Sequence, residues 1–163
     1  MKTKLFITLL AIIATLNSHS QSINVFIGGA VKNTMLYGIE LRSENYGVYV
    51  TRYANNVDLP KKSIQPNQSE NPISIVYDGL TAGINRHIEC LSEVNLFAGV
   101  GMLNEYSIYS EQKGLKSMDT QQKFAFELGA GKDFRLNNMN IGIKFGVNTC
   151  TSIFGALSIG YGF

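Results

Sequence analysis

The sequence has no tryptophan, two histidines, two cysteines and three prolines among its 163 residues. The histidines offer little to a Ser–His hydrolase, because His19 lies near the N-terminus and His87 is the only one left downstream. Pro60, Pro66 and Pro72 fall within one stretch, which leaves the rest of the chain free to form strands. Charged residues make up only 16%, which is low for a wall that faces water.

The N-terminus has the pattern of a secretory signal peptide. A basic start and an apolar run over residues 5–16 precede the small residues Ser18 and Ser20. The apolar run is too short to span a bilayer as a helix, which disfavours the alternative of an N-terminal anchor. We therefore expect residues 1–20 to be removed and residues 21–163 to form one domain.

The apparent basicity of the chain belongs to this leader. Without Lys2 and Lys4, the 14 Lys and Arg fall to 12 and equal the 12 Asp and Glu. A near-neutral domain gives no reason to expect a nucleic-acid or strongly acidic partner. After the leader no segment approaches a transmembrane helix, so the domain could enter a membrane only as strands.

Alternation of apolar with small or polar residues is the dominant pattern of the mature chain. In the clearest example Ile141, Ile143 and Phe145 alternate with Gly142 and Lys144. The pattern predicts eight strands, at about 22–31, 35–42, 46–54, 73–86, 91–106, 122–134, 140–149 and 154–163. In the fourth strand the apolar parity changes, which predicts a bulge near Asp78 and Gly79.

The connections between these strands alternate in length. Two are long and polar, at 55–72 and 110–121, whereas those at the other end of the strands are short. An even-stranded up-and-down barrel with short turns at one end has this pattern. The few charges and many glycines of the polar parity favour a narrow lumen, with the apolar parity facing lipid. Aromatic residues near strand ends suit the girdles of such a wall: Tyr37, Tyr46, Tyr77, Phe124, Phe134, Tyr161 and Phe163.

The last strand carries a family resemblance. Its apolar parity ends on an aromatic C-terminus and consists of Leu157, Ile159, Tyr161 and Phe163. This pattern resembles the C-terminal insertion signal of small eight-stranded bacterial outer-membrane β-barrels of the OmpA transmembrane-domain and OmpX type, and of the short Bacteroidetes-type barrels. The resemblance implies a monomer in the cell outer membrane of a Gram-negative bacterium. Its partners would be outer-membrane lipid and, during biogenesis, periplasmic chaperones and the barrel-assembly machinery.

The charges on the polar parity predict an interior network. An isolated buried charge costs several kcal/mol, so we expect Glu40, Glu127 and Lys144 to pair inside the barrel, with Arg42 or Glu93 nearer an end. The alternative is a set of separately hydrated charges near the rims.

The search for other chemistry predicts no catalytic residue, metal site or cofactor. His87 lies in a predicted turn with no partner serine motif, and Cys90 beside it lacks a second pair of ligands with zinc spacing. The strand order places Cys90 and Cys150 at opposite ends of the barrel, so we expect no disulfide between them.

These patterns favour a non-enzymatic outer-membrane barrel with a structural, surface-contact or adhesion role through its long loops. Two alternatives stay open: a narrow, porin-like passive channel, and a soluble periplasmic barrel that binds an apolar ligand. A lipid-modifying enzyme is disfavoured because the required His and Ser pairing is missing.

Overall fold

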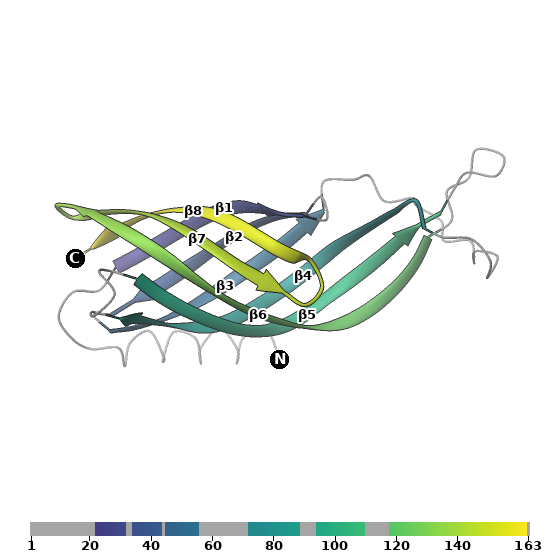
Figure 1. Cartoon of the computed structure of the whole chain (residues 1–163), viewed down its shortest axis with the longest axis horizontal. Helices are drawn as coiled ribbons and strands as arrows, with labels where there is room; N and C mark the ends of the chain where they lie inside the picture. Colours follow the sequence, from purple (N-terminus) through teal and green to yellow (C-terminus); the bar gives the residue numbers. More distant parts are fainter. Residues whose placement is uncertain are drawn as a thin grey trace, which may run out of the picture.

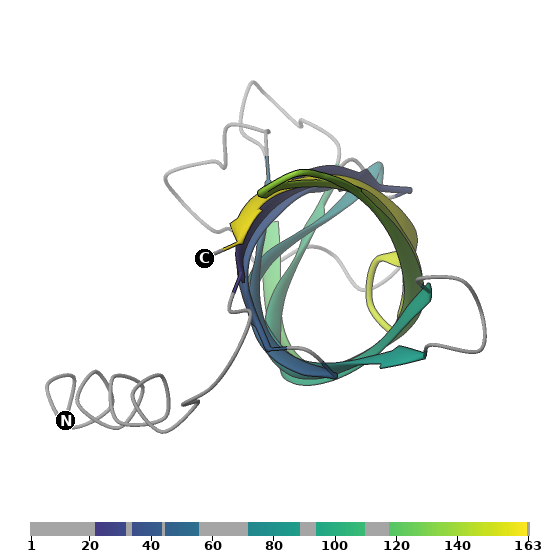
Figure 2. The same ribbon diagram turned by 90° about the vertical axis from the view of Figure 1, so that its left-hand side faces the viewer.

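Eight antiparallel strands form a closed barrel. The computed structural model describes residues 22–31, 34–43, 45–55, 72–88, 94–109 and 118–162. Its strands are β1 (Ser22–Ala30), β2 (Thr34–Arg42), β3 (Tyr46–Asn55), β4 (Ser74–Ile88), β5 (Val94–Ile108), β6 (Met118–Leu136), β7 (Met139–Asn148) and β8 (Ser152–Gly162). Each strand pairs with the next, and β1 also pairs with β8, so the sheet closes (Figures 1 and 2). The predicted up-and-down fold is confirmed.

The two ends of the barrel differ. The ends of β2 and β3 that pair at Arg42 and Gly47, and the β6–β7 connection, lie at one end of the barrel, which we call the turn end. It includes Ser43, Asn45, Asn137 and Asn138. At the other end β4, β5 and β6 run on past the remaining strands as a three-stranded extension (Figure 1). None of the described segments is a helix long and apolar enough to cross a bilayer.

The extension makes β6 longer than predicted. This strand begins at Met118, whereas alternation predicted a start at residue 122 and a loop up to residue 121. Thr120, Gln121 and Gln122 are all exposed and polar, so this stretch has no apolar face to give a period of two. Its pairing with β5, from Gln122 opposite Asn104 to Met118 opposite Ile108, is visible only in the structure.

The predicted bulge in β4 is absent. The register of β4 against β5 is continuous from Ser74 opposite Ile108 to Ile88 opposite Val94. The change of apolar parity has another cause. Ile75 points inward and packs against the buried cluster in the extension, whereas Leu80 and the later apolar residues of the same parity, such as Ile84, face outward. An apolar residue near the end of a barrel strand therefore need not lie on the outer wall.

The barrel is apolar outside and polar inside. On the wall, Leu157 is 63% exposed and Leu128 is 61% exposed, whereas Glu40 inside has no exposed surface. Of the six predicted girdle residues that the structure describes, five are likewise half-exposed: Tyr37, Tyr46, Phe124, Phe134 and Tyr161. Tyr77 is the exception: it is buried, which corrects its assignment to a girdle.

Inside, large aromatic rings lie directly across from glycines of the neighbouring strand. The register pairs Phe26 with Gly38, Tyr49 with Gly83, Phe97 with Gly129 and Phe154 with Gly146. At each of these glycines an added Cβ would collide with the facing ring. The glycines of the polar parity thus provide room for four rings in a narrow lumen.

Several predictions fall outside the described residues. These are the leader at 1–20, Cys90, which was predicted not to pair with Cys150, and the candidate residues Glu93 and Phe163. Most of both long connections, 56–71 and 110–117, lies outside as well. Those expectations stay predictions.

Candidate functional site

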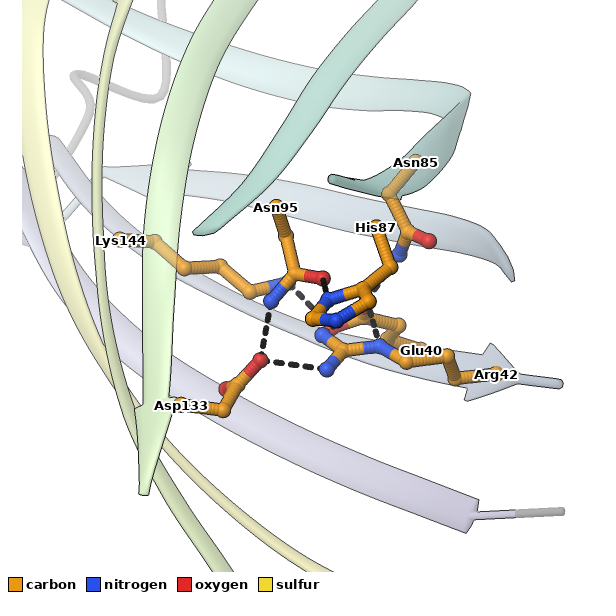
Figure 3. A network of polar contacts seen from close by, with 7 residues as sticks. All are labelled: Glu40, Arg42, Asn85, His87, Asn95, Asp133 and Lys144. Carbon is orange, nitrogen blue, oxygen red and sulfur yellow. Dashed lines mark hydrogen bonds and ion pairs between the residues drawn. The ribbon is translucent and has the colours of Figure 1, made fainter. Parts of the chain in front are cut away.

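Glu40 is the centre of a buried polar network inside the turn-end half of the barrel. Its carboxylate accepts hydrogen bonds from Lys144 Nζ, from Asn85 Nδ2 and from the Arg42 guanidinium, whose Nη2 lies 2.7 Å from Oε1 (Figure 3). The side chain of Lys144 is only 8% exposed, so this ion pair is shielded from bulk solvent. Two cations and one amide thus satisfy a single buried carboxylate.

Strand alternation explains why these groups meet. Glu40 and Arg42 are two residues apart on β2, so both point into the lumen, and Lys144 occupies an inward position on β7. The Lys144 ammonium also lies 4.4 Å from the centre of the Phe26 ring, and 5.8 Å from the ring centres of Tyr49 and Phe97. Aromatic rings therefore surround the cation and stabilise it by cation–π contact in a site shielded from solvent.

The network continues toward the turn end through Asp133. This carboxylate accepts hydrogen bonds from Arg42 Nη1 and Asn95 Nδ2, and Asn95 Oδ1 lies 3.1 Å from His87 Nδ1 (Figure 3). The two carboxylates of Glu40 and Asp133 balance the two cations of Arg42 and Lys144. This balance keeps four ionised groups compatible with a low-dielectric interior.

Glu127 lies apart from this network. It is buried, and its Oε2 accepts hydrogen bonds from Tyr53 Oη at 2.7 Å and Thr81 Oγ1 at 2.9 Å. No ion pair within the described strands includes Glu127. The structure thus brings together Glu40, Lys144 and Arg42 of the predicted set, and gives Glu127 hydroxyl donors in place of a cation.

Three network members were missed by the sequence analysis: Asp133, Asn85 and Asn95. His87 is a correction, because it was predicted to lie in a turn, whereas the structure places it in β4, where its Nδ1 contacts Asn95 Oδ1. A signal for Asp133 was present, because it shares the inward parity of Glu127 on the same strand. Asn85 and Asn95 also occupy inward positions near strand ends. Reading the polar parity to the end of each strand would have found all three.

The lumen beyond this network is filled by side chains. Leu36, Tyr53, Leu103 and Ala125 are fully buried there, beside Cys150. The cavity between Tyr49, Glu127 and Lys144 has a volume of about 10 Å³, which is no more than one water molecule needs. The part of the lumen that these described residues line is therefore packed and leaves little room for water.

The filled lumen predicts an absence of ion conduction. Purified protein reconstituted in a planar bilayer should give no discrete conductance steps. The recording salt is about 1 M KCl, at which the Debye length is about 3 Å. Bilayers that contain a known open barrel serve as the control for incorporation. Regular steps that require the folded protein would contradict the filled interior and support the passive-channel alternative.

A second polar cluster lies in the extension. Glu105 Oε2 accepts hydrogen bonds from Tyr77 Oη at 2.6 Å and Lys123 Nζ at 2.8 Å. This cluster lies beyond the apolar part of the wall, where burial and the hydrogen bond to Glu105 raise the pKa of Tyr77 above its usual range. Within the described residues, no group of three His, Cys, Asp or Glu side chains is placed to hold a metal ion.

The residues of the expected insertion signal lie on the outer wall. Leu157, Ile159 and Tyr161 of β8 all face outward, and the Tyr161 hydroxyl accepts a hydrogen bond from Asn138 Nδ2 at 3.3 Å. Cys150 follows β7 at the opposite end of the barrel from Ile88 and Val94, between which Cys90 stands in the sequence.

A closed eight-stranded barrel with an apolar wall and a filled polar interior is the architecture of the small outer-membrane β-barrels, and this chain has it. No protein-family model and no curated protein matches the sequence. The crystal structure of Ail, the attachment invasion locus protein of Yersinia pestis, is 16% identical with a TM-score of 0.49, over 90% of this chain and 100% of that one.

Two further solved structures are similar. The N-terminal β-barrel domain of Pseudomonas aeruginosa OprF is 12% identical with a TM-score of 0.46, over 88% of this chain and 97% of that one. Neisserial surface protein A is 15% identical with a TM-score of 0.38, over 88% and 94%. These likenesses concern the fold alone; the polarity of the wall and lumen is a property of this chain's own residues.

Proposed function

We propose that the protein is a non-enzymatic integral barrel of the bacterial outer membrane, with a structural or surface-contact role through its extension and long connections. The main support is the distribution of side chains, which is the reverse of that in a soluble protein. Apolar side chains cover the wall on every strand, whereas Glu40, Glu127 and Lys144 are buried inside. A soluble monomer rarely exposes so large a continuous apolar surface, and in lipid that surface is buried.

The soluble-carrier alternative requires the opposite distribution. A periplasmic barrel that binds an apolar ligand has an oily lumen and a charged outer wall. Here the described part of the lumen holds three hydrogen-bonded carboxylates, those of Glu40, Glu127 and Asp133. The cavity between Tyr49, Glu127 and Lys144 has a volume of about 10 Å³, which is too small for an organic ligand. We therefore favour lipid as the partner of the wall and a monomer as the functional unit. Chaperones and the assembly machinery would act only during biogenesis.

The extension supports a surface-contact role. On its outer face the wall changes from apolar Leu80, Met102 and Phe124 to polar Asp78, Asn104 and Gln122 within one step along each strand. Asp78 forms an ion pair with Arg52 at this boundary. Strands that continue past an apolar band project into water, where they and the connections they carry can meet other surfaces.

Surface labelling tests the proposed orientation, in which the extension lies outside the cell and the turn end lies in the periplasm. Thr120→Cys, in a Cys90→Ser background, should react with a membrane-impermeant maleimide on intact cells, because Thr120 is exposed on the extension. The matched variant Asn138→Cys, exposed at the turn end, should react only after the cells are permeabilised. The background protein, which keeps the buried Cys150, gives the baseline. Labelling of position 138 but not 120 on intact cells would contradict the proposal.

A further inference from the structure

The outer wall carries very few charges, and their placement is asymmetric. Among the described residues only Arg52, Asp78, Arg86 and Lys132 are charged and occupy outward-facing strand positions. Arg52 and Asp78 neutralise each other next to the extension. Arg86 and Lys132 both lie near the turn end, and neither forms an ion pair with another described residue.

Each of these two cations is held against an aromatic ring of the wall. The Arg86 guanidinium carbon lies 5.5 Å from the centre of the Tyr46 ring, which is directly opposite it in the β3–β4 register. Lys132 Nζ lies 5.6 Å from the centre of the Phe134 ring, two residues further along β6. Both rings are half-exposed on the wall, so the cations are positioned at the level of an aromatic girdle.

The two cations are close enough to serve one ligand. Arg86 is opposite Leu96 of β5, and Leu96 is opposite Ala130 of β6. Lys132 lies two residues after Ala130 and faces the same side. Two strand spacings and an offset of two residues therefore separate them, about 12 Å between the two Cα atoms, and both side chains are long enough to reach a group between them. The surface next to them toward the extension is apolar, with Leu96 and Leu128 exposed.

We propose that Arg86 and Lys132 form a binding site for the headgroup of an anionic phospholipid in the periplasmic leaflet. The phosphate would accept hydrogen bonds from both cations, and the acyl chains would lie along the apolar wall of β5 and β6. Charge complementarity selects this ligand: two cations without acidic partners among the described residues face the depth at which lipid phosphates lie. The inference rests on the proposed membrane location.

Lipid binding to the refolded mature protein tests the site. In native mass spectrometry from neutral detergent, we expect phosphatidylglycerol to bind more tightly than phosphatidylcholine of the same chain length. The expected ratio is roughly twenty-five-fold, since each of the two cations near an anionic surface contributes about five-fold. The Arg86→Gln/Lys132→Gln variant should lose this preference. Arg135→Gln removes the same charge from β6 but on the inward parity at the turn end, and should keep it.

Three outcomes would overturn the site. The first two are equal binding of the two lipids to the parent protein and an unchanged preference in the double variant. The third is displacement of phosphatidylglycerol by inorganic phosphate at about millimolar concentration, which would indicate a weak site for free anions. The mobility of each sample on gels before and after boiling is recorded separately. A sample without a heat-dependent shift is not a barrel and counts against the proposed function, whereas a shifted sample without lipid preference counts only against this site.

Discussion

Replacing Glu40 by glutamine is expected to lower the free energy of unfolding by about 3 kcal/mol, because it leaves buried cations without their charge partner. Glu40 has no exposed surface and forms ion pairs with both Lys144 and Arg42. Arg42 keeps Asp133, so the main loss falls on Lys144. The measurement is urea-induced unfolding of protein refolded in lipid vesicles, with the folded fraction followed by gel mobility.

The matched control is Asp78→Asn, which removes a carboxylate from an ion pair on the outside of the barrel. The side chains of Arg52 and Asp78 are 39% and 30% exposed, so solvent screens this pair and we expect a loss below about 1 kcal/mol. Lys144→Met should also destabilise, and Glu40→Gln/Lys144→Met should lose less than the sum of the two single variants. Additive losses, or a loss from Glu40→Gln no larger than the control, would show that the buried pair does not act as a unit.

Replacing Gly129 by alanine is expected to cost about 3 kcal/mol, at the upper end of the range for overpacking. An added Cβ at this position would collide with the Phe97 ring and with the main-chain oxygen of Phe145. The ring is hemmed in by Tyr49, with centroids 5.8 Å apart, and by Phe154 at 6.0 Å. The same urea titration measures the loss.

Gly29 provides the control for this substitution. It faces outward on β1, and the atom nearest to an added Cβ is Thr34 O at 4.0 Å. Gly29→Ala should therefore leave stability within about 0.5 kcal/mol of the parent protein. Equal losses at both positions would mean that the cost comes from strand glycines in general and not from the ring that lies over Gly129.

Alternation was enough to predict the fold, since a period of two over eight segments leaves few other architectures. It also assigned faces correctly over most of the wall, for example at Ile141 and Leu157. Alternation alone could not decide which face lines the lumen; the few charges and many glycines of the polar parity favoured that parity. The closed sheet confirms this assignment, because it places Glu40 and Lys144 on the inside.

The contacts inside the barrel were harder to predict. Parity says that Glu40, Glu127 and Lys144 share the lumen, but their height and their position around it depend on the register of every intervening strand pair. In the structure Lys144 is level with Glu40, whereas Glu127 lies beside Tyr53 and Thr81. A pattern of residue types contains no information on that stagger.

The errors near the strand ends have a different cause. Tyr77 is buried and Ile75 is partly buried within the extension, although their residue types suit an outer wall or girdle. The predicted bulge and the misplaced girdle tyrosine both assumed that apolar and aromatic side chains face outward along the whole length of β4. The rule changes where the strand leaves the apolar band, next to the Arg52–Asp78 ion pair.

The most direct test of the account is the location and heat-dependent gel mobility of the mature chain in cells that express it. We expect the protein in the outer-membrane fraction, with a band that changes mobility when the sample is boiled, because a closed barrel with an apolar wall stays folded in detergent until heated. A protein in the soluble periplasmic fraction without a mobility shift would contradict the assignment of the apolar wall to lipid.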